Sequence, residues 1–294
     1  MTAHPFVKWV GGKTQILPEI RRRYPAKIEK YCEPFVGGGA VLFDVLSTFS
    51  PEEVLINDIN PELINTYRQI KESTEELIGV LKVIENEYYS STDKKSYFYE
   101  KRERFNTLIK NRENTVEKAA LFIMINKTCF NGLYRVNGKG LFNVPFNHAE
   151  HPTFCDEENL RACGNLLRNT SITRGDYSTT ESFIDDRTFV YIDPPYRPLT
   201  ASSHFTSYNE NGFTDRDQVQ LGKFFTELSS KGASVLLSNS DPKNVDRNDD
   251  FFDDLYRDYN IDRVSASRMI NSKASGRGAV SELLINNGYE KGEK

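Results

Sequence analysis

Phe189–Leu199 reads FVYIDPPYRPL: four residues suited to a buried strand run directly into an acid, two prolines and a tyrosine. Four segments have a strand-like composition and end at a polar or glycine-rich turn: Tyr31–Phe35, Glu53–Ile56, Thr188–Ile192 and Ala233–Leu237. Helical patterns lie between the four segments, which is typical of an α/β domain with a mostly parallel sheet. The sequence therefore predicts an α/β fold. Asp193–Tyr196 would stand at the carboxyl end of a strand, where open α/β sheets bind ligands.

The middle of the chain carries helix signals. Asn is a favoured N-cap, Pro is a favoured first helical residue, and Ser or Asn followed three residues later by Glu predicts a capping box. We therefore expect residues 61–170 to form helices around one long loop, from Asn126 to His151. Residues 262–287 predict two strands around a loop rich in Ser, Gly, Lys and Arg. The helix signals are Asn60 with Pro61, Ser73 with Glu76, and Asn114 with Glu117.

The composition, 38% hydrophobic and 27% charged in 294 residues, is that of a globular protein. No apolar run is long enough to span a membrane and the N-terminus lacks a secretory signal, so we expect a cytoplasmic protein. No apolar patch is obvious, so we expect a monomer. His148 and His151 have no Cys or carboxylate cluster around them, so no metal site is expected. The cysteines lack paired spacing and are predicted to be reduced thiols: Cys32, Cys129, Cys155 and Cys163.

The charge is unevenly distributed along the chain. The net charge of −4 on its face argues against a nucleic-acid partner. However, residues 1–30 and 101–148 carry net charges of +5 and +6, and residues 241–262 carry −5. Two basic segments can still present a positive face to DNA. The alternative is that these segments are solvated helix faces, and on charge alone we favour that alternative.

Two stretches are rich in glycine. Gly11–Thr14, GGKT, resembles the end of a phosphate-binding loop, but Val7 stands where that loop needs its first glycine, so ATP binding is not predicted. In Glu33–Phe43, EPFVGGGAVLF, Gly37 and Gly39 let a ligand approach the backbone closely. The third glycine of the dinucleotide fingerprint is missing there. A nucleoside smaller than a dinucleotide is therefore the favoured ligand.

The acids at two predicted strand ends suit a nucleoside and an amine. Asp58 ends the strand VLIND, where an acid can bind ribose hydroxyls, although it could instead be a helix-start acid next to Pro61. The carboxylate of Asp193 and the carbonyl of Pro194 can accept both hydrogens of a base's exocyclic amine. The ring of Tyr196 offers a face on which an extruded base can stack. The alternative is that Asp193–Tyr196 is only a strand end capped by prolines, without a functional role.

Five blocks occur in one order along nearly the whole chain, and with them the chain resembles the Dam-type DNA adenine-N6 methyltransferases. The resemblance implies a Rossmann-like sheet that uses S-adenosylmethionine, with a helical target-recognition insertion. It also implies transfer to adenine N6 in double-stranded DNA, with GATC as the target and base flipping as the means of access. In restriction-modification members, a restriction endonuclease acts on the same site. The blocks are FVKWVGGK (6–13), EPFVGGGA (33–40), INDIN (56–60), FNGLYRVN with FNVPF (130–137, 142–146), and DPPYRPLTASSHFTSY with GF (193–208, 212–213).

The resemblance also implies roles for individual residues. Residues 1–60 and 171–294 would form the catalytic domain, and residues 61–170 the target-recognition domain. Asp193, Pro194 and Tyr196 would be catalytic. The cofactor would contact Trp9, Lys13, Phe35, Gly37, Gly39, Asp58, Asp176 and Asp193. DNA would contact Lys8 at the first base, Phe130 in the base stack, Asn131, Leu133 at the thymine methyl, Arg135 at a guanine, and Pro145 across the loop.

One departure concerns specificity. Asn147–Ala149 stands where some family members have Arg and Tyr, so a contact to the outer base pair is expected to be altered. RNA adenine or protein glutamine methylation is a second possibility, but those enzymes tend to place Asn where this chain has Asp193. A catalytically silent DNA-binding module is a third, and a nicotinamide dehydrogenase a distant fourth.

Overall fold

The computed structural model describes residues 3–197, 213–267 and 279–292. The chain divides into two compact units. Strand β2 (Glu53–Asp58) belongs to both, because its first half packs in one unit and its second half in the other. The first unit comprises Met1–Gly12, Val36–Thr48 and Ile56–Asp176, and the second comprises Lys13–Phe35, Phe49–Leu55 and Tyr177–Lys294.

In the described part of the chain, seven strands form one mixed sheet, ordered β3-β2-β1-β4-β5-β7-β6. β4 runs parallel to β1 and β5, whereas β7 runs antiparallel to β5 and β6. From β3 to β5 this is the strand order of a Rossmann-like sheet, in which the order reverses between β1 and β4. The predicted α/β class is therefore confirmed. The remaining strands are β1 (Lys30–Glu33), β3 (Thr170–Arg174), β4 (Thr188–Ile192), β5 (Ser234–Ser240), β6 (Asn260–Ser267) and β7 (Ala279–Asn286).

All four strands predicted in the α/β pattern are present, with the predicted bounds or with different ends. β2 starts at Glu53 as predicted and runs two residues past Ile56, to Asp58. β4 has the predicted bounds, and all its side chains are buried. β1 ends before Pro34 rather than at Phe35, because proline has no N–H to extend the ladder. β5 continues past Leu237 through Ser238–Ser240, whose buried backbone pairs with β7. These polar residues carry the strand to the carboxyl edge of the sheet.

Strand β3 was not predicted. It is an edge strand, and of its five side chains only that of Thr170 is buried. Such a strand has no apolar run or clean alternation in its sequence. The two C-terminal strands were predicted and are confirmed as β6 and β7, while the loop predicted between them, residues 268–278, lies outside the described residues.

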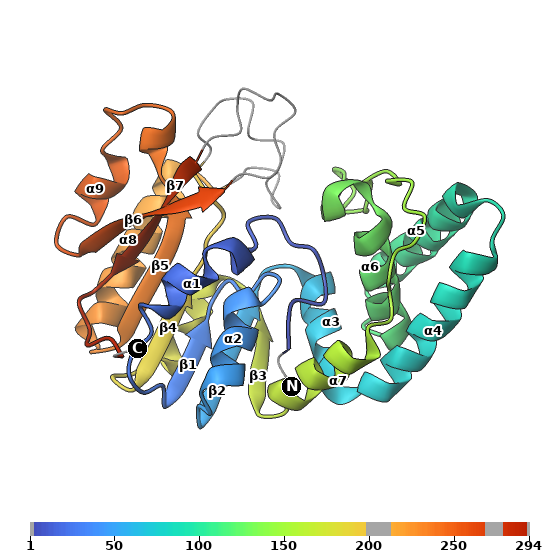
Figure 1. The fold of residues 1–294 in the computed structure, drawn as a ribbon, viewed down its shortest axis with the longest axis horizontal. Coiled ribbons are helices and arrows are strands. Elements are labelled where there is room, and N and C mark those ends of the chain that lie inside the picture. The colour runs from blue at the N-terminus through green and yellow to red at the C-terminus, as the bar shows by residue number, and fades with distance from the viewer. Residues whose placement is uncertain (1–2, 198–212, 268–278, 293–294) are drawn as a thin grey trace. The chain divides into compact units, whose positions relative to one another are not determined.

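The first unit is mainly helical, as predicted (Figure 1). Helix α6 packs against α3, α4 and α5, and it is buried on nearly all sides. Its run AALFIMI has almost no polar face, as expected for a helix enclosed by others. The helices of this unit are α2 (Ala40–Thr48), α3 (Pro61–Glu72), α4 (Thr74–Ser90), α5 (Lys94–Lys110), α6 (Val116–Thr128) and α7 (Glu157–Leu167).

Two of the three predicted helix starts are right, since α3 begins after Asn60 and α4 after Ser73, but only Asn60 makes the expected side-chain cap. The side chain of Asn60 caps α3 by accepting hydrogen bonds from the backbone N–H groups of its first turn, at 3.0 and 2.9 Å. Ser73 makes no side-chain cap to α4, because the same residue also closes α3. Helix α6 is capped by Thr115 and not by Asn114, and Glu117 pairs with Arg104 instead of completing a box.

The second unit holds the centre of the sheet. Helix α8 (Asp215–Ser230) packs against β5, and its apolar face contributes to a core built with β4, β5 and β7 (Figure 1). Thr214 and Asp217 form a capping box at its start. The other helical segments of this unit are the turns η1 (Lys13–Gln15), η3 (Tyr177–Phe183) and η5 (Pro242–Asn244) and the short helices α1 (Leu17–Arg21) and α9 (Phe251–Leu255).

The expected long loop and free thiols are observed. Helix α6 continues to Thr128, and the loop after it contains the turn η2 (Phe130–Gly132) and two isolated bridges. All four cysteines are free thiols. Among the described residues, none of the helices combines the length and apolar character needed to cross a membrane. The expected split between catalytic and target-recognition domains concerns function and stays a prediction.

Candidate functional site

Asp193 directly follows β4, and its carboxylate is held on both oxygens. The ammonium of Lys13 lies 2.8 Å from Oδ2. The hydroxyl of Ser238 donates to Oδ1 at 3.0 Å, and the Tyr191 hydroxyl lies 2.9 Å from the same Ser238 oxygen. Ser238 reaches Asp193 because β4 and β5 are parallel and in register, with Ile192 beside Leu237. The parallel sheet thus fixes the orientation of this carboxylate.

The charge of Asp193 depends on its neighbours. Burial raises the pKa of the Asp193 carboxyl, and the Lys13 ammonium and the Ser238 hydroxyl oppose that shift. Lys13 belongs to the GGKT stretch that resembles a phosphate-binding loop, yet it begins the turn η1 and is only 4% exposed. Its side chain therefore serves the carboxylate of Asp193.

Tyr196 is oriented from two sides. Its hydroxyl donates to Oε2 of Glu282 at 2.6 Å, and the Lys13 ammonium lies 4.7 Å from the centre of its ring. Burial raises the pKa of the Tyr196 phenol well above its usual value, and Asp193 and Glu282 raise it further. The phenol therefore remains a hydrogen-bond donor at neutral pH.

The two prolines between these residues are anchored by a buried amide pair. Gln218 of α8 donates from Nε2 to the carbonyl of Pro195 at 3.2 Å. Asn239 of β5 in turn donates to Oε1 of Gln218 at 3.1 Å, and both amides are buried. Pro194 is itself buried. The backbone from Asp193 to Tyr196 is thus fixed along its length.

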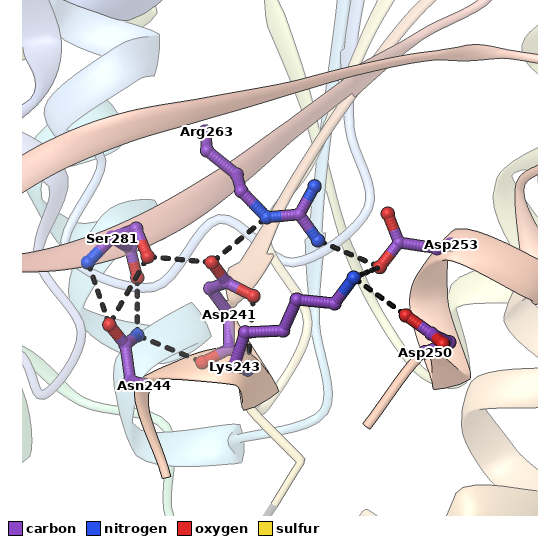
Figure 2. A network of polar contacts seen from close by, with 7 residues as sticks. All are labelled: Asp241, Lys243, Asn244, Asp250, Asp253, Arg263 and Ser281. Atoms are coloured by element: carbon purple, nitrogen blue, oxygen red, sulfur yellow. Dashed lines mark hydrogen bonds and ion pairs between the residues drawn. The ribbon is translucent and has the colours of Figure 1, made fainter. Parts of the chain in front are cut away.

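A polar network fastens the strands that bring Glu282 into place (Figure 2). Asp241, at the end of β5, accepts hydrogen bonds from Arg263 of β6 at 3.1 Å and from Ser281 of β7 at 2.6 Å. Asn244 also pairs with Ser281, through its side chain and the serine's backbone. Because Ser281 precedes Glu282, this network fixes the strand that carries the partner of Tyr196.

Phe35 joins an aromatic cluster in the second unit. Its ring stacks on Tyr177, with centroids 5.2 Å apart and an angle of 29°. The edge of Phe213 approaches it at 6.2 Å. Phe35 is nevertheless only partly buried.

In the first unit, the glycine-rich turn brings together four predicted cofactor residues: Trp9, Gly37, Gly39 and Asp58. The backbone N–H of Gly37 donates to Oδ2 of Asp58 at 3.1 Å, and Tyr67 donates from its hydroxyl to the Gly37 carbonyl at 3.0 Å. Gly37 has a φ of +48°, and a Cβ there would lie 2.8 Å from Cδ1 of Trp9. Gly39 also has a positive φ, +76°, and packs on Tyr67. Only glycine fits either position.

Asp58 lies at the start of α3, as the helix-start interpretation of its position expected, and its contact with ribose hydroxyls stays a prediction. Its Oδ1 accepts from the N–H of Asn60 at 2.9 Å at the start of α3, while its other oxygen binds the glycine-rich turn. Burial raises the pKa of its carboxyl, and the Asn60 and Gly37 N–H groups oppose that shift. Gly175 donates to the Asp58 carbonyl at 3.2 Å, which brings exposed Asp176 to the same end of β2.

Four of the six predicted DNA contacts lie on one turn, Phe130–Arg135, which we call the recognition turn after that predicted role. Phe130 is 52% exposed, so it is not a core residue of the helical unit. Arg135 is exposed, and its Nε donates to Oδ1 of Asn143 at 2.8 Å. Phe130 donates its N–H to the carbonyl of exposed Pro145 at 2.9 Å, so both sides of the loop meet here. Exposed Asn131 and half-buried Leu133 complete the turn.

The recognition turn also contacts the N-terminal segment. Lys8 is exposed, but a Cβ on Gly132 would lie 2.6 Å from the Lys8 Cβ, so the two backbones pack closely. Tyr134 stacks on Trp9 at 6.4 Å and 27°, and its hydroxyl donates to Glu62 at 2.7 Å. The predicted DNA residues and Trp9 thus belong to one packed group.

Several residues of the site were not predicted from the sequence: Ser238, Glu282, Gln218, Asn239 and Tyr67. Ser238 and Asn239 did carry a signal, because two polar residues continue the apolar run VLL at the carboxyl end of a parallel strand. Glu282 is a lone acid among apolar residues of a strand. Gln218 and Tyr67 look like ordinary helix residues, and no local signal distinguishes them.

Comparison with known proteins gives one consistent result. A Type II methyltransferase of Methanocaldococcus jannaschii is 44% identical to this chain, over 98% of the chain and 100% of the relative. DNA adenine methylases of Serratia marcescens and Escherichia coli are 35% and 33% identical, over 95% of this chain and 96% and 93% of the relatives. The family model described as D12 class N6 adenine-specific DNA methyltransferase matches residues 9–270. The chain therefore belongs to the D12 class of N6 adenine-specific DNA methyltransferases.

Proposed function

We propose that this DNA adenine methyltransferase uses S-adenosylmethionine and modifies N6 of an adenine flipped out of a GATC site. The observation that carries the proposal is the Asp193 carboxylate at the end of β4, with Lys13 at one oxygen and Ser238 at the other. A carboxylate fixed by an ammonium and a hydroxyl, followed by a restrained proline backbone, suits a neutral amine that must be held by its hydrogens.

The residues present fit S-adenosylmethionine. Its ribose needs a hydrogen-bond acceptor, and Asp58 is a half-buried carboxylate beside a bare glycine-rich backbone. Its adenine needs flat apolar faces, and Phe35 is a partly exposed aromatic ring in the second unit. When bound, it offers a methyl group on a positively charged sulfur. We assign its binding to the predicted set of Trp9, Lys13, Phe35, Gly37, Gly39, Asp58, Asp176 and Asp193.

The chain's own residues hold the target amine. Asp193 accepts one N6 hydrogen and the Pro194 carbonyl accepts the other, which favours a more tetrahedral, more nucleophilic nitrogen. Tyr196 stacks on the extruded base through the ring face that Lys13 does not cover. Positioning and electrostatics then carry the reaction, without a covalent enzyme intermediate.

We assign DNA recognition to the recognition turn and its neighbours, within a target-recognition region of residues 61–170. Phe130 enters the stack vacated by the adenine, and Arg135 forms a bidentate contact with a guanine. Leu133 meets the thymine methyl, Lys8 contacts the first base, and Asn131 and Pro145 flank the site. Asn147–Ala149 replaces the Arg and Tyr of some relatives, so the outer base pair depends more on Arg135.

The test is transfer of labelled methyl from S-adenosylmethionine to two duplexes, one with a single GATC and one with that site scrambled. Label in the first duplex alone is the expected result. Label in both would keep the chemistry and overturn the GATC assignment, and label in neither would overturn the proposed donor or target. Asp193→Ala should abolish transfer while DNA binding persists, whereas the exposed control Asp186→Ala should retain activity.

A further inference from the structure

We infer that Asn126 is a positioning residue for DNA recognition, which holds Lys8 and the recognition turn in one fixed arrangement. The inference rests on the proposed function, because it takes Lys8 and Phe130–Arg135 to be DNA contacts. Asn126 lies in the last turn of α6 and is only 4% exposed. It is itself too buried to meet DNA, so its effect must pass through the residues that it binds.

The amide of Asn126 bonds both segments at once. Its Oδ1 accepts from the backbone N–H of Lys8 at 2.7 Å. Its Nδ2 donates to the carbonyl of Lys8 at 2.8 Å and to the carbonyl of Gly132 at 2.9 Å. An amide has one acceptor and two donor hydrogens, and here all three functions are used. Aspartate has a similar size but offers no donor for the two carbonyls.

The two segments that Asn126 joins are in direct contact. Gly132 adopts a φ of +63°, and any Cβ there would meet Lys8 at 2.6 Å from its Cβ. Asn131 has a positive φ of +54°, which is uncommon for a residue with a side chain. Such a backbone persists only where the surroundings fix it. The Asn126 bond to Gly132 lies at the next residue and supplies that restraint.

The consequence is a fixed spacing between DNA contacts that lie far apart in sequence. The side chains of Lys8 and Phe130 are both exposed, and the buried amide of Asn126 bonds the backbone of Lys8 and that of Gly132, two residues after Phe130. If these bonds are lost, each side chain keeps its chemistry but not its place relative to the other. Recognition of a short sequence depends on that spacing, because base contacts carry the sequence information.

The chain offers a matched control for a purely structural role. Asn159 of α7 binds the backbone of His4 with the same geometry: its Oδ1 accepts from the N–H at 2.9 Å, and its Nδ2 donates to the carbonyl at 3.0 Å. Asn159 is 5% exposed, close to the value for Asn126. It therefore fastens the same N-terminal segment four residues earlier, at His4 and not at the recognition turn.

The experiment compares Asn126→Asp with Asn159→Asp in the full-length enzyme. Single-turnover methyl transfer is measured on a GATC duplex and on duplexes with one outer base pair changed, together with KM for DNA, S-adenosylmethionine affinity and melting temperature. Asn126→Asp should raise KM for DNA and reduce discrimination by about tenfold, the size expected for losing one buried hydrogen-bond partner. The affinity for S-adenosylmethionine should stay within about twofold, because the side chain of Asn126 bonds Lys8 and Gly132, which are not predicted cofactor residues. Asn159→Asp should lower the melting temperature and keep discrimination.

A second variant covers the case in which Asn126→Asp fails to fold. Gly132→Ala pushes the recognition turn away from Lys8 without touching the amide and should give the same loss of discrimination. Unchanged discrimination in a folded variant, or equal losses in both Asn→Asp variants, would overturn the inference. Lys8→Ala and Arg135→Ala distinguish a failure of the proposed DNA contacts from a failure of the positioning role of Asn126. If these also keep discrimination, the proposed DNA contacts are wrong; if they lose it while Asn126→Asp keeps it, only the positioning role is wrong.

Discussion

Lys13 and Asp193 form a buried ion pair, with 2.8 Å between Nζ and Oδ2, in which the lysine is 4% and the aspartate 21% exposed. Such a pair is a poor way to gain stability, because removing both charges from water costs as much as their attraction returns. Its value here is in fixing a charge at the end of β4. The GGKT stretch thus supplies a cation for a carboxylate.

Lys13→Met tests this role through the pH dependence of the reaction. Burial already raises the pKa of Asp193 and Lys13 opposes that shift, so removing Lys13 should raise the pKa further. Activity requires the ionised carboxylate and is lost as pH falls through this pKa. The acid limb of the single-turnover pH profile should therefore move to higher pH, with a lower rate at neutrality.

The control for this prediction is Lys243→Met. Lys243 also pairs with carboxylates, Asp250 at 2.6 Å and Asp253 at 3.0 Å, but these belong to the network of Figure 2. Its removal should leave the acid limb where it is in the wild type. An unmoved acid limb in Lys13→Met would show that Lys13 does not set the charge of Asp193.

Tyr196 and Glu282 should act as one unit. Their hydrogen bond of 2.6 Å joins a phenol to a carboxylate, a class of bond worth about 1.5–3 kcal/mol. Tyr196→Phe keeps the stacking ring but frees its orientation, and Glu282→Gln removes the charge from the acceptor. Each should lower kcat by roughly tenfold, and the double variant should be little worse than either alone. Additive losses would mean that Glu282 acts independently of Tyr196.

The fold was predictable where the local signal was strong. The apolar run of β4 ends in Asp-Pro-Pro-Tyr, and the Asn60-Pro61 pair starts α3 where expected. Edge strand β3 was not predicted, because all its side chains except that of Thr170 are at least partly exposed and so show no apolar pattern. Thr115 rather than Asn114 caps α6, since adjacent polar residues compete for a cap and tertiary packing decides between them.

The residues predicted to be catalytic could be found in the sequence, but the residues that hold them in place could not. Asp193 and Tyr196 stand in one recognisable tetrapeptide, but their partners Ser238 and Glu282 lie 45 and 86 residues further along the chain. Only the pairing of β4 with β5 and of β5 with β7 brings them together. Strand pairing of this kind is non-local, and a single sequence does not reveal it.

Gly37→Ala and Gly79→Ala should have opposite effects on stability. Gly37 has a φ of +48°, and its added Cβ would lie 2.8 Å from Trp9, so we expect a loss of about 1–3 kcal/mol in the free energy of unfolding. Cofactor affinity should fall with it. Gly79 is an exposed helix residue with nothing within 4 Å of an added Cβ, so alanine there should stabilise by about 0.5–1 kcal/mol. Urea unfolding measures both, and a neutral Gly37→Ala would contradict the packing on Trp9.

Phe130→Ala should impair base flipping specifically. The 52% exposed ring can fill the space that the adenine leaves, so its removal favours the base's return to the helix. With 2-aminopurine at the target adenine, the fluorescence gain on binding should fall, while Phe130→Trp should largely keep it. Tyr89→Ala, at another exposed aromatic residue of 44% exposure, is the control and should behave like the wild type. An undiminished signal in Phe130→Ala would move the wedge role elsewhere.

Arg135→Ala should relax discrimination at the outer guanine. The hydrogen bond of 2.8 Å from its Nε to Asn143 fixes the plane of the guanidinium, and a bidentate contact to guanine is worth about 1–3 kcal/mol of discrimination. Arg135→Lys should also lose much of it, because an ammonium cannot make that planar pair. Exposed Lys139, in the same loop, is the control. Lys139→Ala should reduce only the salt dependence of DNA binding, because the loss of a charge that contacts phosphates weakens the binding of all sequences alike. If both alanine variants change only the salt dependence, Arg135 contacts the backbone and guanine is read by another residue.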